Sequence, residues 1–240
     1  MDRRTEGHVA MGDFGRAFTF IGEHPHLLLQ KSLDTLALSG AALGIAIAIG
    51  LPLGVWLGHA RRGSFLVING SNVLRALPSL AVIALGLALL GIGFTNVMFA
   101  LVVLAFPVIL TNAYAAVGGV DQDVVEAARG MGMKSLEVVT RVELPLAVPL
   151  TFAGIRTAAV YVVATSPLAG FVGGGGLGDI IVNQPQYRLA GVLAAALVIA
   201  ALAFATEVLL ALVQRALTPR VLRAEARAPA IGPATREITA

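Results

Sequence analysis

Five long apolar stretches constrain the fold of this chain more than any other feature. They run from Leu33 to Leu57, Phe65 to Leu90, Val97 to about Val117, near Pro149 to about Val172, and Ala190 to Val213. Each is long enough to cross a bilayer, since a transmembrane helix needs about 20 predominantly apolar residues. Because a backbone inside the bilayer must satisfy its own hydrogen bonds, we predict an all-α polytopic membrane protein with about five transmembrane helices.

Composition agrees with a membrane protein and disfavours several kinds of site. Of the 240 residues, 57 % are hydrophobic and only 13 % are charged. The net charge of +3 does not indicate a nucleic-acid partner, because the basic residues fall mostly at predicted membrane edges. The chain has no cysteine, and no spacing of His, Asp and Glu resembles a metal cage. We therefore expect no metal and no cofactor.

The chain divides into three parts. Residues 1–32 form an amino-terminal segment, in which Phe14, Phe18 and Ile21 share one face of a predicted interfacial helix that ends at His24-Pro25. This segment lacks the apolar core of a signal peptide, so we expect no cleaved leader. Residues 33–220 form the transmembrane domain, and residues 221–240 form a polar tail predicted to be disordered.

The longest polar interruption lies between the third and fourth apolar stretches, at residues 121–145. Asp123 and Glu126 predict a capping box, with a short helix that begins near Val124. Two glycines then permit a turn, and a second short helix is predicted from Ser135, its N-cap, to Val142. This helix is expected to stop before Pro145, because proline disfavours helix in its predecessor.

The same segment carries a motif with fixed spacing, EAA-x3-G-x9-hydrophobic-x-LP. Its positions are Glu126, Ala127, Ala128, Gly132, Val142, Leu144 and Pro145. In order and spacing it resembles the cytoplasmic coupling loop of ABC-importer permeases. Four further phrases look like those of permeases for glycine betaine, choline and related osmoprotectants: residues 77–81, 106–110, 154–158 and 171–178.

The resemblance implies a MetI-like ABC permease fold in the bacterial cytoplasmic (inner) membrane. It implies that the chain is not an enzyme and that its loop binds a separate ATP-hydrolysing ABC subunit. An extracytoplasmic substrate-binding protein would deliver the solute, and a second permease subunit, identical or related, would complete the pathway. Two alternatives remain: an ABC permease for another small solute such as an amino acid, and an ion-coupled secondary transporter that uses Arg156 or Glu207.

Polar side chains within the apolar stretches are candidates for the translocation path. Asn69, Asn72, Arg75 and Ser79 form one helical stripe, and Tyr161 and Thr165 lie on one face of the fourth stretch. The first stripe faces either the path or the cytoplasmic interface. The threonine either faces the path or bonds its own backbone.

Two ionisable residues, Arg156 and Glu207, are predicted at similar depth in different spans, where they either pair or find separate solvation. The glycine-rich run Gly173–Gly176 lacks a following GK[ST] and is interpreted as a flexible outer connection.

Positive charge predicts the orientation. The predicted inner segments carry most of the basic residues, from Arg61 and Arg62 to Arg215, whereas the outer loops carry only Arg188. The positive-inside rule then places the carboxyl terminus in the cytoplasm. The basic amino-terminal segment is the exception.

Overall fold

The computed structural model describes the backbone of residues 3–217 and the side chains of residues 13–217. This part of the chain is helical and contains no strand, which confirms the all-α prediction. The α-helices are α1 (Arg3–Glu23), α2 (Pro25–Ala60), α3 (Ser64–Ala76), α4 (Ser79–Leu90), α5 (Phe94–Gly118), α6 (Gln122–Gly130), α7 (Ser135–Val138), α8 (Leu144–Thr165), α9 (Gly178–Val182) and α10 (Gln184–Leu217). A π-helical segment, η1 (Val139–Glu143), precedes α8, and a 3-10 segment, η2 (Ser166–Val172), follows it. The predicted tail, 221–240, lies outside the described residues.

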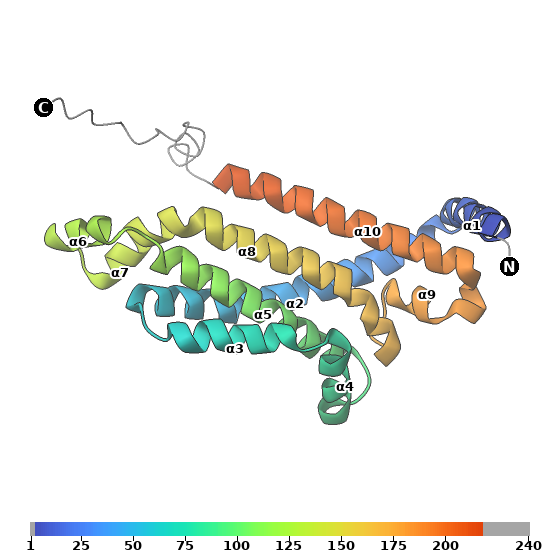
Figure 1. The fold of residues 1–240 in the computed structure, drawn as a ribbon, viewed down its shortest axis with the longest axis horizontal. Helices are drawn as coiled ribbons and strands as arrows, with labels where there is room; N and C mark the ends of the chain where they lie inside the picture. Colours follow the sequence, from blue (N-terminus) through green and yellow to red (C-terminus); the bar gives the residue numbers. More distant parts are fainter. Residues whose placement is uncertain (1–2, 218–240) are drawn as a thin grey trace, which may run out of the picture.

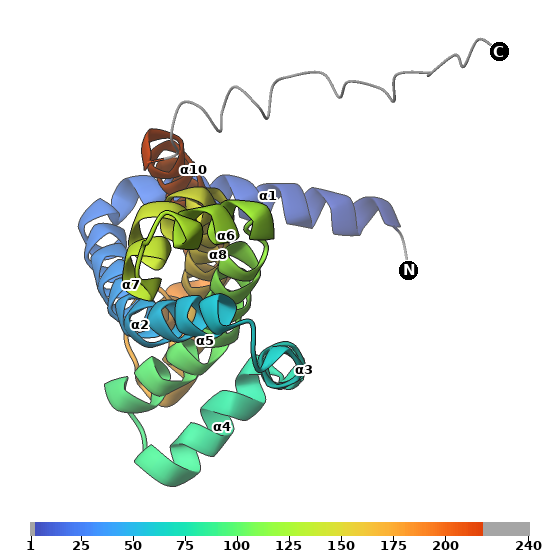
Figure 2. The ribbon, with the colours of Figure 1, turned by 90° about the vertical axis from the view of Figure 1, so that its left-hand side faces the viewer.

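The molecule is elongated, and α2, α5, α8 and α10 run along its long axis (Figure 1). The short helices α6 and α7 form one end, and α1 and α9 lie at the opposite end. Viewed from the α6–α7 end, α3 and α4 lie on one side of the bundle, and α10 and α1 lie on the other (Figure 2). The helix α5 packs against both α2 and α8 and is the centre of the bundle.

Among the described residues, four helical stretches are long and apolar enough to cross a membrane by themselves. The pair α3 and α4 becomes a fifth span if it is counted as one broken helix, with a bend of 88°. The break falls at Leu77-Pro78 and is a sharp corner, since proline cannot donate the hydrogen bond that continues a helix. About five spans were expected, and one of the five is broken.

Small residues let the central helices approach closely. Gly50, Gly54 and Gly58 form one buried face of α2 against α5. A Cβ atom on Gly54 would lie only 2.7 Å from the Cβ of Ala113 and 2.8 Å from the carbonyl oxygen of Leu110. Glycine is therefore required at position 54, because the two backbones lie too close for a side chain. Close approach at small residues is a usual way for helices to associate within a bilayer.

Candidate functional site

The 121–145 segment folds as a compact knob at one end of the bundle. The carboxylate of Asp121 accepts a hydrogen bond from the Asp123 N–H at 3.0 Å and caps α6. Asp123 is therefore not the N-cap as predicted, because Asp121 is better placed to accept the first free N–H. Gly132 adopts a φ of +87°, a conformation that L-residues rarely adopt, and it provides the turn between the two helices.

The second helix of the knob differs from the prediction at both ends. Its N-cap is Lys134, whose backbone N–H donates to the Glu137 carboxylate at 2.9 Å, so Ser135 is not the cap. The helix also does not stop before Pro145. The π-helical turn η1, closed by the bond from Leu144 N–H to Val139 O, carries the chain into α8. Pro145 then stands at the start of α8, where a missing N–H is tolerated.

The motif residues divide into a packed set and an exposed set. Ala128 is buried in a small apolar core that also contains Val120, Val125 and Val138, with Val142 against its edge. Glu126, Ala127 and Gly132 are exposed, and Leu144 and Pro145 are half-buried where the knob meets the bundle.

Three apolar side chains that the sequence motif did not single out add to the exposed tip of the knob. They are Val124, Met131 and Leu136, which are 43 %, 73 % and 73 % exposed. Exposed apolar side chains at the tip of a packed turn are typical of a docking surface. Their position is the signal by which sequence reasoning could have found them, since Val124 lies two residues before Glu126, and Met131 and Leu136 lie between motif residues.

The end of α2 holds the knob through side chains that sequence reasoning missed. His59 Nδ1 lies 2.7 Å from Glu143 Oε2, and His59 Nε2 lies 2.6 Å from Ser135 Oγ. The residue Glu143 is only 1 % exposed, so water can hardly reach its carboxylate, and the contact with His59 takes the place of water. Arg61 donates from Nη2 to the Val120 carbonyl oxygen at 2.9 Å. These contacts join α2 to both ends of the knob.

A cavity of about 340 Å³ opens between α3, α5 and α8. Its lining residues are Arg75, Leu104, Val108, Asn112, Thr157 and Tyr161. Arg75 donates from Nη2 to the Pro107 carbonyl oxygen at 3.1 Å and to Thr111 Oγ1, which fixes the guanidinium against α5. Of the six residues predicted for the path, this cavity brings together only Arg75 and Tyr161.

The other four predicted path residues lie outside this cavity. Asn69 is exposed and bonds its own helix at Phe65 O, 2.9 Å away, and Asn72 is exposed. Ser79 begins α4 beyond the break. Thr165 donates to Tyr161 O at 2.7 Å, which is the backbone-bonding alternative for this threonine.

Arg156 and Glu207 meet between α8 and α10. Arg156 Nε lies 3.1 Å from Glu207 Oε1, and Arg156 Nη1 donates to Gln214 Oε1 at 3.1 Å. Gln214 also donates to the Pro149 carbonyl oxygen at 2.9 Å. The side chains are 31 % and 41 % exposed, and an unpaired charge at such a position costs on the order of 3 kcal/mol on insertion scales. Arg156 and Glu207 therefore pair, which was the first of the two alternatives expected from the sequence. The pair joins α10 to α8.

Sequence similarity identifies the family. Residues 50–223 match the family of binding-protein-dependent transport system inner membrane components. The chain belongs to this family. It is 37 % identical over 210 residues to the glycine betaine/carnitine/choline transport system permease protein OpuCB of Bacillus subtilis, covering 85 % of this chain and 95 % of that protein. It is 38 % identical over 210 residues to a carnitine transport permease protein of Listeria monocytogenes, covering 87 % and 96 %.

A choline transport system permease protein of Bacillus subtilis is also 38 % identical, over 197 residues that cover 80 % of this chain and 89 % of that protein. Among solved structures, an inward-facing MetNI methionine ABC transporter matches with a TM-score of 0.70 and 25 % identity, covering 80 % of this chain and 97 % of that chain. These findings confirm the expected permease fold and the multi-pass inner-membrane class.

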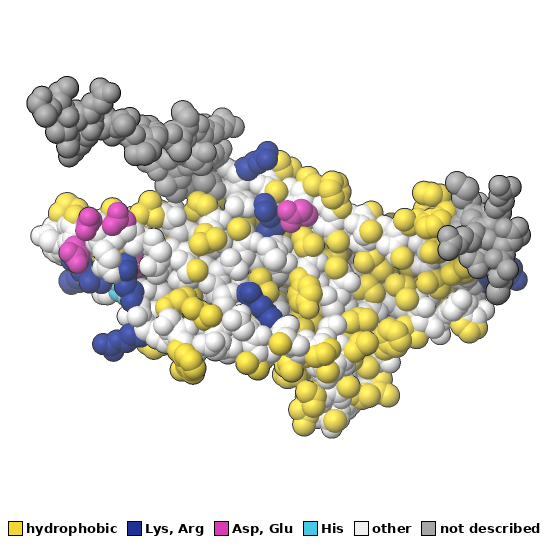
Figure 3. Space-filling view, viewed as in Figure 1, with side chains coloured by type: hydrophobic (Ala, Val, Ile, Leu, Met, Phe, Trp, Pro, Cys, Tyr) yellow, Lys and Arg dark blue, Asp and Glu magenta, His cyan; other side chains and the backbone are white. Residues whose placement is uncertain are grey.

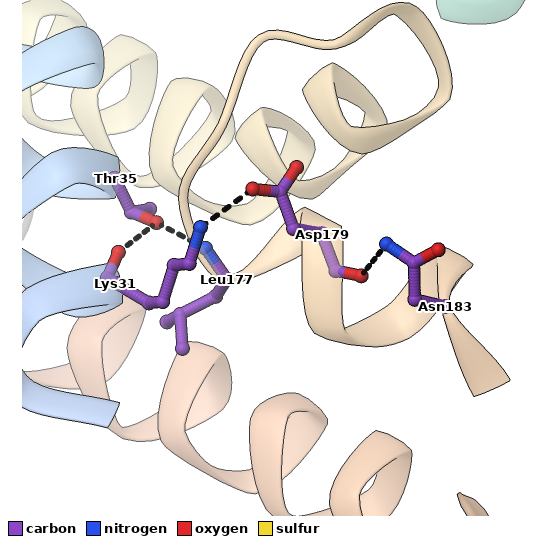
Figure 4. Close-up of polar contacts among 5 residues, drawn as sticks. All are labelled: Lys31, Thr35, Leu177, Asp179 and Asn183. Carbon is purple, nitrogen blue, oxygen red and sulfur yellow. Dashed lines mark hydrogen bonds and ion pairs between the residues drawn. The ribbon is translucent and has the colours of Figure 1, made fainter. Parts of the chain in front are cut away.

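The glycine-rich run of the permease lies at the end opposite the knob (Figure 1), and Figure 4 shows the polar contacts beside it. Lys31 Nζ lies 2.6 Å from Asp179 Oδ2, and the Leu177 N–H donates to Thr35 Oγ1 at 2.9 Å. Leu177 is fully buried, and a Cβ on Gly176 would lie 2.6 Å from Thr35 Oγ1. Gly176 therefore packs against α2, and Gly174 lies close to Val97 of α5 and Ala169 of η2, whereas Gly173 is exposed. The run is packed in part, and the flexibility expected of this connection stays a prediction.

Charge is unevenly distributed over the permease (Figure 3). In this view the charged side chains are densest at the α6–α7 end, a few more are scattered over the rest of the surface, and hydrophobic side chains cover much of the remaining described surface. Among the described residues, no group of three or more His, Cys, Asp and Glu side chains could hold a metal ion.

Proposed function

We propose that this permease forms the membrane pathway of an ABC importer for quaternary ammonium osmoprotectants such as glycine betaine, carnitine or choline. The observation that carries the proposal is the folded knob: a fully matched coupling motif, packed on its own core, that exposes Glu126, Ala127 and an apolar tip. The solute class is supported by the relatives named for glycine betaine, carnitine and choline.

The knob is proposed to dock on a separate ATP-hydrolysing subunit. Val124, Met131 and Leu136 would bury their exposed apolar surface there, and Glu126 would lie at the edge of the contact. An extracytoplasmic binding protein delivers solute at the opposite end, and a second permease, identical or related, closes the pathway. Lipid covers the remaining apolar face. The chain itself performs no chemistry in this scheme.

Motion of the knob reaches three helices. It passes directly to α5 and α8, which the knob connects, and to α2 through His59 and Arg61. Closure of the ATPase pair would then move these helices as a body and switch the pathway between inward-open and outward-open forms. In this scheme the knob and the carboxyl terminus face the cytoplasm, in agreement with the basic residues of the knob and Arg215.

Uptake into proteoliposomes tests this function. The permease is reconstituted with its ATPase and binding protein, and uptake of labelled glycine betaine, carnitine, choline and methionine is measured with and without ATP. We expect ATP-dependent uptake of at least one quaternary ammonium solute, and loss of that uptake in Glu126→Ala and Gly132→Pro. Uptake of methionine alone would favour an amino-acid importer, and uptake without ATP would favour an ion-coupled transporter.

A further inference from the structure

We propose that Arg75 and Tyr161 form a subsite on the translocation path for a zwitterionic solute. The guanidinium of Arg75 takes the carboxylate of the solute, and the ring of Tyr161 takes its quaternary ammonium group. This inference rests on the proposed function, because it names which of these solutes the path accepts best. It distinguishes glycine betaine and carnitine, which carry a carboxylate, from choline, which does not.

Arg75 is an exposed cation in the last turn of α3, next to the break in the α3–α4 pair, and has no acidic partner among the described residues. Among residues 13–217, the ion pairs join other groups, and none reaches Arg75. The side chain is held in place by neutral acceptors only, the Pro107 carbonyl oxygen and Thr111 Oγ1. A charge in an apolar span is rare unless it faces a path or a partner. An anionic group of the solute would supply the missing charge.

The guanidinium also keeps donors free. Both bonds to α5 come from Nη2, which leaves the N–H groups of Nε and Nη1 without an acceptor among the described residues. Two N–H groups of one planar guanidinium match the two oxygens of a carboxylate. The bonds from Nη2 fix the plane, so these donors are presented in one orientation.

The rest of the cavity fits the other end of a small zwitterion. Tyr161 lines the cavity and is 41 % exposed, so its ring is available to a ligand, and aromatic rings bind quaternary ammonium groups. Leu104 and Val108 provide an apolar wall for methyl groups. Asn112 donates to Val108 O at 2.8 Å, which leaves its carbonyl oxygen as an acceptor. The volume of about 340 Å³ is at the small end of ligand cavities.

The unpaired charge of Arg75 opposes a purely cationic solute. Choline carries a positive charge with no carboxylate to place on the guanidinium, so Arg75 repels it. Replacing Arg75 by a neutral residue therefore has opposite effects on the two solute types: it removes a contact for a zwitterion and a repulsion for a cation. A merely structural role would lower the uptake of both.

The test compares solutes in the complete importer. Uptake of glycine betaine and choline, and the ATPase activity stimulated by the binding protein, are measured for the wild type, Arg75→Gln and Arg75→Lys. We expect Arg75→Gln to lower glycine betaine uptake per ATP hydrolysed by about tenfold or more, as loss of a charge-assisted contact implies. Choline uptake should stay within about threefold or rise, the stimulated ATPase activity should be retained, and Arg75→Lys should lie between. Arg62→Gln, which removes an exposed arginine outside the cavity, should change neither uptake.

Tyr161 supplies an independent measurement. Tyr161→Phe keeps the ring and should preserve uptake of both solutes, whereas Tyr161→Leu should lower both by a similar factor. The subsite is wrong if Arg75→Gln lowers both uptakes equally, leaves glycine betaine uptake within about threefold, or abolishes ATPase stimulation. A wild type that imports choline but no zwitterion also overturns it. A wild type that imports no quaternary ammonium solute instead overturns the proposed function.

Discussion

Replacing His59 with leucine tests how the knob is held to α2. His59 is the residue of α2 that contacts Glu143, and it bridges to Ser135 on the other side of the ring. Leucine removes both hydrogen bonds at similar volume. Glu143 is then left in the protein interior, 1 % exposed, without the imidazole that now lies 2.7 Å away.

The magnitude follows from the burial of Glu143. Removing the hydrogen-bond partner of a buried polar group costs about 1 to 3 kcal/mol, because the remaining group keeps its desolvation penalty. The Ser135 bond adds little, since that hydroxyl is exposed and can bond to water. We therefore expect His59→Leu to lower the free energy of unfolding by about 1 to 3 kcal/mol, or the melting temperature by roughly 2 to 12 °C for a chain of this size. His59→Leu with Glu143→Leu replaces both partners by apolar groups and should lie within about 1 kcal/mol of the wild type.

Thermal unfolding of the detergent-solubilised permease, followed by circular dichroism, measures this cycle. The control is His26→Leu, which removes an exposed histidine and should change stability by no more than about 0.5 kcal/mol. The stimulated ATPase activity of the assembled importer should fall in His59→Leu, because α2 is then held to the knob by fewer contacts. Glu143→Leu alone completes the cycle. If the effects of His59→Leu and Glu143→Leu add in the double variant, His59 and Glu143 are not coupled, and α2 is held to the knob by other contacts.

Three further substitutions give distinct expectations. Gly54→Ala should destabilise the permease by about 1 to 3 kcal/mol in the same thermal assay, because its Cβ would lie 2.7 Å from that of Ala113. Gly132→Ala should cost about 1 to 2 kcal/mol, because it forces an L-residue to a φ of +87°, and it should weaken binding of the permease to its ATPase in a pull-down titration. Thr35→Val should lower the free energy of unfolding by about 1 to 3 kcal/mol, because it leaves the buried N–H of Leu177 without its acceptor. It should also speed limited proteolysis at residues 173–176. An unchanged cleavage rate would show that this bond does not hold the glycine-rich run in place.

Much of the fold follows from the sequence because hydropathy and proline act locally. The apolar stretches mark the spans, and Pro78 marks the break between α3 and α4. The spacing of the motif also identifies the knob and its turn at Gly132. These features depend on residues close together in the chain, so a single sequence contains them.

Contacts between distant segments are what the sequence does not reveal. His59 and Glu143 are separated by 84 positions, and nothing near His59 indicates that it lies against the knob. Pro145 was misjudged for a related reason, because local preference favours a stop there, whereas the π-helical turn and packing against the bundle continue the helix. Tertiary packing decides both cases.

The path residues show the same division. Periodicity places Asn69, Asn72 and Arg75 on one face of α3, but it does not show at which level the neighbouring helices form a cavity. The cavity lies between α3, α5 and α8 at the level of Arg75, and Asn69 and Asn72 lie outside it. The helical stripe on α3 therefore predicted one residue of the cavity, Arg75, but the other residues of the stripe do not line it.

The polar contacts of α2 limit where the permease can bend. Thr35 and Lys31 join α2 to the glycine-rich run at one end, His59 and Arg61 join it to the knob at the other, and Gly54 leaves no clearance against α5 between them. A helix held at both ends and along its length moves with its neighbours, because close-packed contacts deform little. Movement of the knob should therefore displace α2 and α5 together, and the change of shape should fall on the 88° corner between α3 and α4. That corner is next to Arg75, so the element that bends is also the one that carries the charged group of the cavity.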